Sequence, residues 1–314
     1  MKKLSVLISF KNEGEEVART CKSARDTAGD NIDIIVLNDA SDPFDYKTSL
    51  EPYDVKYYES TERLGSSLGK EFCVEHCETP YFLILDAHCR LSEGWLDKAL
   101  EILEKGEDCI YCCRTRFFSD DEAQNLVGTD GYGAYYSYTT PRFLGVSWNI
   151  KKLSDIEFEV PSILGANYLC SKRWWSYIKG FKGLRLYGAE EPYVSRKSWL
   201  LGGKVKCVPQ IITYHKQRIE KKFPYTVHNY ELVHNELVIG YTIFADRWDA
   251  IKDAYLNTTN ETSYSNALEV FNSHIEELNI LRNYYAEHTK MPISELDNFN
   301  KEFCKTIGIK TNER

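Results

Sequence analysis

Residues 81–95, YFLILDAHCRLSEGW, combine an apolar, strand-like run with two potential metal ligands. The run at residues 81–85 ends directly before Asp86 and His88. Side chains of an extended strand alternate between its two faces, so Asp86 and His88 are expected to project to the same side. A carboxylate and an imidazole placed in this way can bind one metal ion. The plainer alternative is that Asp86 caps a turn and His88 is an ordinary polar residue at a strand end.

A metal site needs a third ligand, and His215 is the candidate. It ends the apolar stretch CVPQIITYH at residues 207–215, which a strand or an extended loop can bring back to the same edge. A carboxylate oxygen with imidazole nitrogens suits a borderline divalent ion such as Mn²⁺, with Mg²⁺ as the alternative. Such a set leaves coordination positions open for phosphate oxygens.

The amino-terminal half of the chain alternates predicted strands with predicted helices. This alternation predicts an α/β fold with a mostly parallel central sheet, flanked by helices on both faces. Ligands of such sheets bind at the carboxyl ends of the strands. The strands are expected at residues 4–10, 32–37, 55–58, 81–85 and 108–113, and the helices at residues 15–26 and from about 65 to 76.

Five motifs follow one another along the chain: SFKNE (9–13), LNDAS (37–41), RLGSSLGK (63–70), LDAHCRLSEGWL (85–96) and YGAEEPYVSRKSWLLGG (187–203). In this order they resemble nucleotide-sugar-dependent glycosyltransferases of the GT-A fold. That class includes the family-two enzymes and the polypeptide N-acetylgalactosaminyltransferases. The resemblance covers residues 3 to about 225 and implies a catalytic domain at 1–225, which leaves residues 226–314 as a carboxy-terminal extension. It also places His215 where those enzymes have a late metal ligand.

The resemblance implies a UDP-sugar donor and an Asp-x-His metal motif. Asp39 is expected to accept a hydrogen bond from the uracil ring, although its cluster of turn formers also suits a plain turn. Arg63 and Lys70 match positions where relatives keep basic residues near the pyrophosphate, although either can be a surface cation. The residues expected around the nucleotide-sugar are Phe10, Asn12, Glu13, Asp39, Arg63, Gly65, Lys70, Ala166 and Asn167.

The pair Glu190–Glu191 bears on the reaction type. Inverting relatives carry an acidic pair whose second member removes the proton of the acceptor, whereas the retaining peptide enzymes carry Gly-Gly-Glu-Asn. A carboxylate can act as a base at neutral pH and an amide cannot, so inversion is favoured, with Glu191 as base. Glu190 is then expected to bind the donor sugar or the acceptor hydroxyl. Retention is the runner-up, and an acidic helix start before Pro192 explains the pair without catalysis.

Two other functions are alternatives to glycosyl transfer. A sugar-phosphate nucleotidyltransferase can be built on a similar sheet, but it needs a glycine-rich, lysine-containing signature after its first strand. SFKNEGEE contains only Gly14, so this signature is missing. A non-catalytic sugar-binding relative is disfavoured because the metal ligands and the acidic pair are both present.

Composition limits the partners and the compartment. The net charge of −8 argues against a nucleic acid as the main partner. No stretch approaches the roughly 20 apolar residues of a membrane span. The basic start MKKLSVLISF is better used as a first strand than as a signal peptide. A cytoplasmic protein is therefore expected, with its 10 cysteines reduced.

Two irregular stretches have candidate roles at the site. Residues 114–152 are rich in Tyr and Gly, and their rings can either stack on an acceptor sugar or pack beneath a long loop. The basic run KQRIEKK at residues 216–222 predicts either a loop that folds over the diphosphate or a solvated linker. The aromatic candidates for the acceptor site are Tyr132, Tyr135, Tyr136 and Trp148.

Beyond residue 225 the pattern is helical. Helices are expected at residues 228–256 and 267–287, with a polar linker at 257–266 between them. Such a tail is expected to pack on its own domain or to pair subunits in a homo-oligomer. The acceptor remains open between a glycan, a lipid-linked saccharide and a protein side chain.

Overall fold

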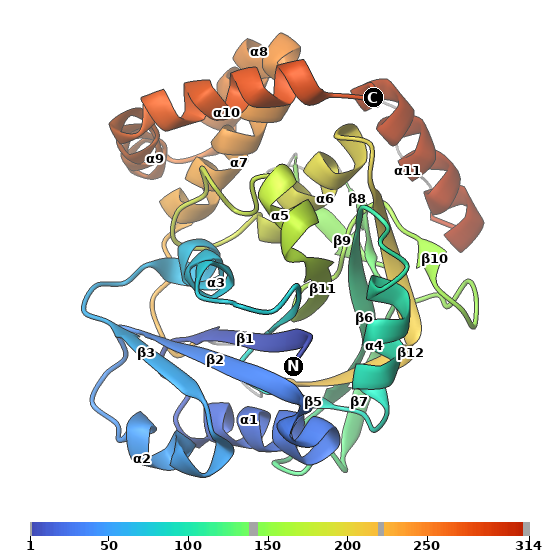
Figure 1. Cartoon of the computed structure of the whole chain (residues 1–314). Coiled ribbons are helices and arrows are strands. Elements are labelled where there is room, and N and C mark those ends of the chain that lie inside the picture. The colour runs from blue at the N-terminus through green and yellow to red at the C-terminus, as the bar shows by residue number, and fades with distance from the viewer. Residues whose placement is uncertain (1, 138–143, 219–222, 310–314) are drawn as a thin grey trace.

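The computed structural model describes residues 2–137, 144–218 and 223–309 (Figure 1). The strands are β1 (Leu4–Phe10), β2 (Ile32–Asp39), β3 (Lys56–Ser60), β4 (Tyr81–Leu85), β5 (Cys89–Leu91), β6 (Cys109–Phe118), β7 (Leu126–Gly131), β8 (Ala134–Tyr136), β9 (Val146–Trp148), β10 (Phe158–Glu159), β11 (Asn167–Ser171) and β12 (Lys204–Lys216). The helices are α1 (Glu15–Ala28), α2 (Tyr46–Leu50), α3 (Gly65–Glu75), α4 (Trp95–Leu103), α5 (Lys172–Tyr177), α6 (Glu190–Leu200), α7 (Asn229–Ile243), α8 (Trp248–Thr258), α9 (Glu261–Ser273), α10 (Ile275–His288) and α11 (Ile293–Ile307).

A curled ten-stranded sheet forms the centre of the molecule. Its strand order is β10-β12-β6-β11-β4-β1-β2-β3, with β5 paired to β12 and β7 paired to β6. Strands β3, β2, β1 and β4 are parallel neighbours, as the alternation of strands and helices predicted. Strand β11 enters antiparallel between β4 and β6, so the sheet is mixed. This insertion brings the start of β11 to the end of β4, where the Asp86 N–H donates to the Ala166 carbonyl at 2.9 Å.

Two apolar cores lie on opposite faces of the sheet. Helices α1, α2 and α4 cover one face, and helices α3, α5 and α6 cover the other (Figure 1). Neighbouring residues of β1 serve different cores, because Val6 and Ile8 pack toward α1 while Leu7 packs toward α3. A strand that is buried on both faces is nearly continuous in apolar residues, which explains the sequence LSVLISF.

The predicted amino-terminal elements are confirmed with small shifts in their ends. The strand expected at 108–113 continues to Phe118, and β5 and α4 were not predicted. The structure is of the α/β class with helices on both faces of the sheet, as the sequence predicted.

The polar linker expected at residues 257–266 was wrong. Helix α8 runs to Thr258 and α9 begins at Glu261, so the polar residues form a short helix-to-helix turn. The side chain of Asn260 caps α9 by accepting a hydrogen bond from the Ser263 N–H at 2.9 Å. The single helix expected at 267–287 is two helices that meet at His274, and α11 was not predicted.

The carboxy-terminal helices pack on the rest of the molecule. Helix α7 contacts α9 and α10, and α11 packs on α6 and β8. Their buried side chains share one core with α3, α5 and α6. The division at residue 225 and the pairing of subunits stay predictions.

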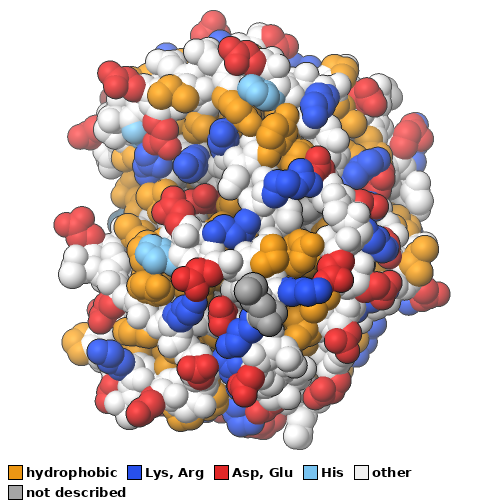
Figure 2. Space-filling view, in the orientation of Figure 1, with side chains coloured by type: hydrophobic (Ala, Val, Ile, Leu, Met, Phe, Trp, Pro, Cys, Tyr) orange, Lys and Arg blue, Asp and Glu red, His pale blue; other side chains and the backbone are white. Residues whose placement is uncertain are grey.

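Acidic and basic side chains are mixed over the face shown in Figure 2. All ten cysteines are free and buried. None of the helices in the described part of the chain has the length and apolar character that a bilayer span requires.

Candidate metal and nucleotide-sugar site

A cavity of about 980 Å³ opens at the carboxyl ends of the parallel strands. Phe10 ends β1, Asp39 ends β2 and Asp86 follows β4, so three neighbouring strands each place a residue in its wall. Glu191 at the start of α6 and His215 near the end of β12 also line it. Segments far apart in the sequence therefore meet around one space, at the edge of the sheet where ligands were expected.

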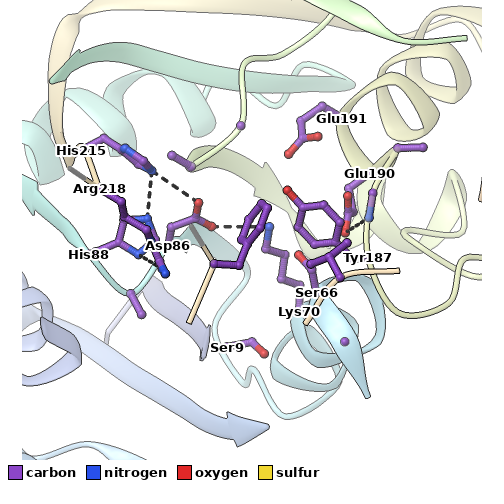
Figure 3. Close-up of a pocket in the computed structure, with 18 of the residues that line it drawn as sticks. Ser9, Ser66, Lys70, Asp86, His88, Tyr187, Glu190, Glu191, His215 and Arg218 are labelled. Atoms are coloured by element: carbon purple, nitrogen blue, oxygen red, sulfur yellow. Dashed lines mark hydrogen bonds and ion pairs between the residues drawn. The ribbon is translucent and has the colours of Figure 1, made fainter. Parts of the chain in front are cut away.

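Asp86, His88 and His215 come together at one side of this cavity (Figure 3). One ligand atom from each of the three lies within 4.8 Å of the others. His215 Nε2 is 3.1 Å from His88 Nε2 and 3.8 Å from Asp86 Oδ2. The local reason differs from the prediction, because Asp86 and His88 lie in a turn between β4 and β5 and not in an extended strand.

The pairing of β12 with β5 delivers His215 to this site. His215 lies opposite Cys89 in the antiparallel ladder, one residue beyond His88. The Lys216 N–H donates to the His88 carbonyl at 2.9 Å and continues this pairing. Backbone hydrogen bonds thus bring together two histidines that are 127 residues apart.

Glu13 contacts the other ring nitrogen of His88. Its Oε2 lies 3.4 Å from His88 Nδ1, and Arg218 donates to the same carboxylate. Burial alone raises the pKa of Glu13, but His88 and Arg218 lower it below its ordinary value. A carboxylate on the outer nitrogen orients a ligating histidine. Glu13 can therefore hold Nε2 of His88 toward the other two ligands.

The three donor groups fit a divalent cation. Burial alone raises the pKa of Asp86, but Lys70 and the hydrogen bond to His215 lower it far below its ordinary range. Burial lowers the pKa of His215 and favours the neutral ring. An ionised carboxylate and a neutral imidazole are the forms that bind metals. Nδ1 of His215 is buried without a hydrogen-bond partner among the described residues.

Lys70 is buried behind the metal site, so it is not a surface cation. It is 7% exposed, and its Nζ lies 3.5 Å from Asp86 Oδ1 and 5.6 Å from the centre of the Tyr168 ring. Burial alone lowers the pKa of Lys70, but Tyr168 and Asp86 raise it well above its ordinary value. A fixed positive charge therefore lies between the metal ligands and the acidic pair (Figure 3).

Glu190 and Glu191 begin α6 on the side of the cavity away from the histidines (Figure 3). Glu190 is 4% exposed, and its Oε1 accepts hydrogen bonds from Ser67 Oγ at 3.3 Å and the Gly188 N–H at 3.2 Å. Burial and the charge of Glu190 raise the pKa of Glu191 to about 7. Glu190 is therefore not a solvated carboxylate at a helix start.

Seven of the nine residues expected around the nucleotide-sugar line the cavity, and Asn12 and Asn167 are not among its described lining residues. Asn167 is a correction, because it is 0% exposed and bonded within the sheet to the Cys113 N–H and to Thr115. The Asn12 amide donates to Asp42 at 2.9 Å and to the Pro224 carbonyl at 3.0 Å. The seven are Phe10, Glu13, Asp39, Arg63, Gly65, Lys70 and Ala166.

Asp39 and Arg63 have protein partners in the structure. The Asp39 carboxylate accepts from the N–H groups of Leu64 at 2.6 Å and Gly65 at 2.8 Å, which ties β2 to the start of α3. Burial raises the pKa of Asp39. Arg63 makes a two-pronged ion pair with Glu231 of α7, with both distances 2.9 Å.

Of the four aromatic candidates, Trp148 lines the cavity and is 47% exposed. Its ring stacks on Phe117, with centroids 5.1 Å apart and planes 5° apart. Tyr132 and Tyr136 are buried in the core, at 7% and 1% exposed, and Tyr135 packs against it. None of these three tyrosines is among the described residues that line the cavity, so an acceptor role for them is not supported.

Several residues that line the cavity were not predicted from the sequence. Tyr187 begins the motif at residues 187–203, but it was not predicted as a site residue. Lys216, Gln217 and Arg218 of the basic run line the cavity, whereas residues 219–222 of that run lie outside the described residues. The other lining residues that were missed include Ser9, Ser66, Phe117, Tyr225 and Leu232.

The chain is similar in sequence to curated glycosyltransferases. Polypeptide N-acetylgalactosaminyltransferase 3 of Drosophila melanogaster is 23% identical over 261 residues, which are 78% of this chain and 39% of that protein. The human polypeptide N-acetylgalactosaminyltransferase 10 is 24% identical over 235 residues, which are 71% of this chain and 39% of that protein. The chain thus spans about two fifths of the length of these curated relatives.

Two solved structures share the fold. GalNAc-T7 with UDP, GalNAc and Mn²⁺ superposes with a TM-score of 0.75 at 16% identity, over 97% of this chain and 58% of that one. S. aureus TarS 1–349 in complex with UDP-GlcNAc gives a TM-score of 0.55 at 13% identity, over 99% and 93%. The glycosyl transferase family 2 domain matches residues 5–195. With that domain over most of its length, the chain belongs to glycosyl transferase family 2.

Proposed function

We propose that the protein transfers a sugar from a UDP-sugar to an acceptor hydroxyl with inversion, with Glu191 as the general base. The observation that carries the proposal is that Glu191, whose pKa is raised to about 7, lines the same cavity as the triad Asp86, His88 and His215. A base is most effective when its pKa lies near the working pH.

The donor and the metal are proposed from chemistry and from relatives. GalNAc-T7 carries UDP and Mn²⁺, and TarS carries UDP-GlcNAc. Asp86, His88 and His215 would hold Mn²⁺, with Mg²⁺ as the alternative. When bound, the ion supplies Lewis-acid stabilisation of the departing nucleoside diphosphate. Lys70 would add a fixed positive charge behind the same phosphates.

The two glutamates are suited to different tasks. Glu190 is buried and held by Ser67 and the Gly188 N–H, so its carboxylate has a fixed position. Its negative charge raises the pKa of Glu191 and makes that carboxylate the stronger base. We assign proton removal from the acceptor to Glu191, and contact with the donor sugar or the acceptor hydroxyl to Glu190.

Retention is the second candidate. It is favoured by the relatives, which are polypeptide N-acetylgalactosaminyltransferases, and by the Asp-x-His form of the metal motif. In that case Glu191 would not remove the proton of the acceptor, and its replacement by Gln would leave transfer intact.

Incubation with Mn²⁺ and a panel of UDP-sugars, followed by an assay of UDP release, tests the activity. The anomeric configuration of the product, measured by NMR, separates inversion from retention. Release of pyrophosphate from UTP and a sugar phosphate would instead show a nucleotidyltransferase. Loss of transfer in Glu191→Gln, with UDP binding preserved, is the expected result for an inverting base.

A further inference from the structure

The loop at residues 185–189, which leads into the acidic pair, has an unfavourable backbone conformation. Its φ angles are 53° at Leu186, 104° at Gly188 and 64° at Ala189. Positive φ is strained for Leu and Ala because the Cβ atom crowds the backbone. Such a conformation persists only where the surroundings hold it. The contacts of this loop therefore decide where Glu190 and Glu191 lie.

Asn235 of α7 bonds this loop at both ends. Its Oδ1 accepts from the Arg185 N–H at 2.9 Å, and its Nδ2 donates to the Gly188 carbonyl at 2.7 Å. The side chain is 0% exposed, so water does not compete for these bonds. The N–H of the same Gly188 donates to Glu190. One buried amide thus fixes the backbone directly before the acidic pair.

His234 fixes the orientation of that amide. Its Nδ1 lies 2.8 Å from Asn235 Oδ1, which already accepts the Arg185 N–H, so Nδ1 carries the proton. Nε2 of His234 then accepts from His274 Nε2 at 2.9 Å, across the junction of α9 and α10. Burial lowers the pKa of His234 to about 3, which keeps the ring in this neutral form.

Glu277 of α10 anchors the approach to the loop. Its carboxylate accepts from the Gly183 N–H at 3.1 Å and from the Arg185 guanidinium. Helices α7 and α10 together hold residues 183–188 by side-chain bonds to the backbone. These helices lie beyond residue 225, where only packing or subunit pairing was predicted from the sequence.

We propose that Asn235 is a positioning residue that holds the backbone of residues 185–188 and so directs Glu190 and Glu191 into the cavity. The effect on turnover rests on the proposed function, because it requires the acidic pair to act on the substrates. Helix α7, with α10 beside it, then positions the acidic pair.

Asn235→Ala tests this role against a matched control. Asn300 of α11 is also buried, and it likewise bonds the N–H and the carbonyl of one backbone residue, Tyr136, at 2.8 and 3.0 Å. Asn300→Ala removes the same kind of bonds away from the acidic pair. Three quantities are compared in both variants: thermal unfolding, hydrogen–deuterium exchange of residues 183–189, and kcat with KM for the donor.

For Asn235→Ala we expect faster exchange in residues 183–189 and a kcat about 10- to 100-fold lower, since small displacements of catalytic groups cost this much. The affinity for UDP with Mn²⁺ should stay within about twofold, because the metal ligands are untouched. Asn300→Ala should keep wild-type exchange in this segment and a kcat within about twofold of wild type.

Unchanged exchange and kcat in Asn235→Ala would overturn the proposal, as would an equal loss of kcat in an Asn300→Ala protein of similar stability. If Asn235→Ala does not fold, Asn235→Asp keeps the acceptor for the Arg185 N–H and places a carboxylate oxygen in place of the donor to the Gly188 carbonyl, and the same outcomes apply. Full transfer by Glu191→Gln would refute only the assignment of Glu191 as the base. Hydrogen–deuterium exchange of residues 183–189 would still test whether Asn235 holds this segment.

Discussion

The ammonium group of Lys70 lies 3.5 Å from the carboxylate of Asp86, which is also a candidate metal ligand. A cation thus lies directly beside a site that is itself suited to a cation. Lys70 would repel a metal ion held by Asp86, and both positive charges would attract a bound diphosphate. Lys70 should therefore favour the complete metal–nucleotide complex over the bare metal.

Lys70→Met should consequently change two affinities in opposite directions. Mn²⁺ alone should bind more tightly, because a repelling charge is gone, while UDP in the presence of Mn²⁺ should bind more weakly. Titration calorimetry with Mn²⁺ and then with UDP measures both. Lys70→Arg keeps the charge and serves as the control. Weaker binding of Mn²⁺ alone to the Met variant would contradict this account.

Asp86→Ala and His215→Ala should each abolish turnover and leave the fold intact. Each change removes one of the three donor groups that converge within 4.8 Å. Manganese binding, followed by electron paramagnetic resonance, should fall together with UDP release. His288→Ala is a suitable control, because His288 lies at the end of α10 and is not among the described residues that line the cavity. Normal turnover in both Asp86→Ala and His215→Ala would remove the metal assignment.

The sequence predicted those features that depend on local pattern. Strand β1 follows from a nearly continuous apolar run and helix α1 from a helical pattern, and the polar residues after each strand mark the edge where the cavity forms. His215 was proposed from the apolar stretch before it and from the resemblance, but its approach to His88 depends on the pairing of β12 with β5. No local pattern specifies which strands pair.

The failures have physical reasons of the same kind. Ala166 lines the cavity, but Asn167 is the next residue, at the start of β11, where consecutive side chains point to opposite faces. The tyrosines of residues 132–136 were predicted as candidates for stacking on an acceptor sugar. The composition of this stretch does not show which of its rings are buried. Asn235 was missed because its partner Gly188 is 47 residues away.

Transfer should depend on the ionisation of Glu191. The pKa of this carboxyl is about 7, so the base form increases as the pH rises through this value. In the inverting reaction kcat should therefore rise between about pH 6 and pH 8 and then level off. A pH profile of UDP release in the presence of acceptor checks this. A flat profile across this range would exclude Glu191 as the titrating base.

The same raised pKa predicts an effect on stability. The pKa is about 7 in the folded protein against an ordinary value of 4.5, so between these pH values the folded state binds more protons than the unfolded state. The free energy of unfolding should therefore fall as the pH rises from about 4.5 to 7, by at most about 3 kcal/mol. Glu191→Gln cannot ionise, so it should exceed the wild type in stability at about pH 8 and match it at about pH 4. Urea unfolding at both pH values measures this, and a less stable variant at the higher pH would contradict it.

Gly165→Ala should displace the base without touching a metal ligand. A Cβ atom at residue 165 would lie 2.9 Å from Glu191 Oε1, which is the far end of a flexible side chain. The carboxylate can move away, so the fold should survive, but the base should lose its position. We expect kcat to fall about 10-fold or more. UDP affinity in the presence of Mn²⁺ and the melting temperature should both remain near wild type. Unchanged kcat would show that Glu191 need not occupy its present position, whereas loss of UDP binding would show that Gly165 acts on the donor and not through the base.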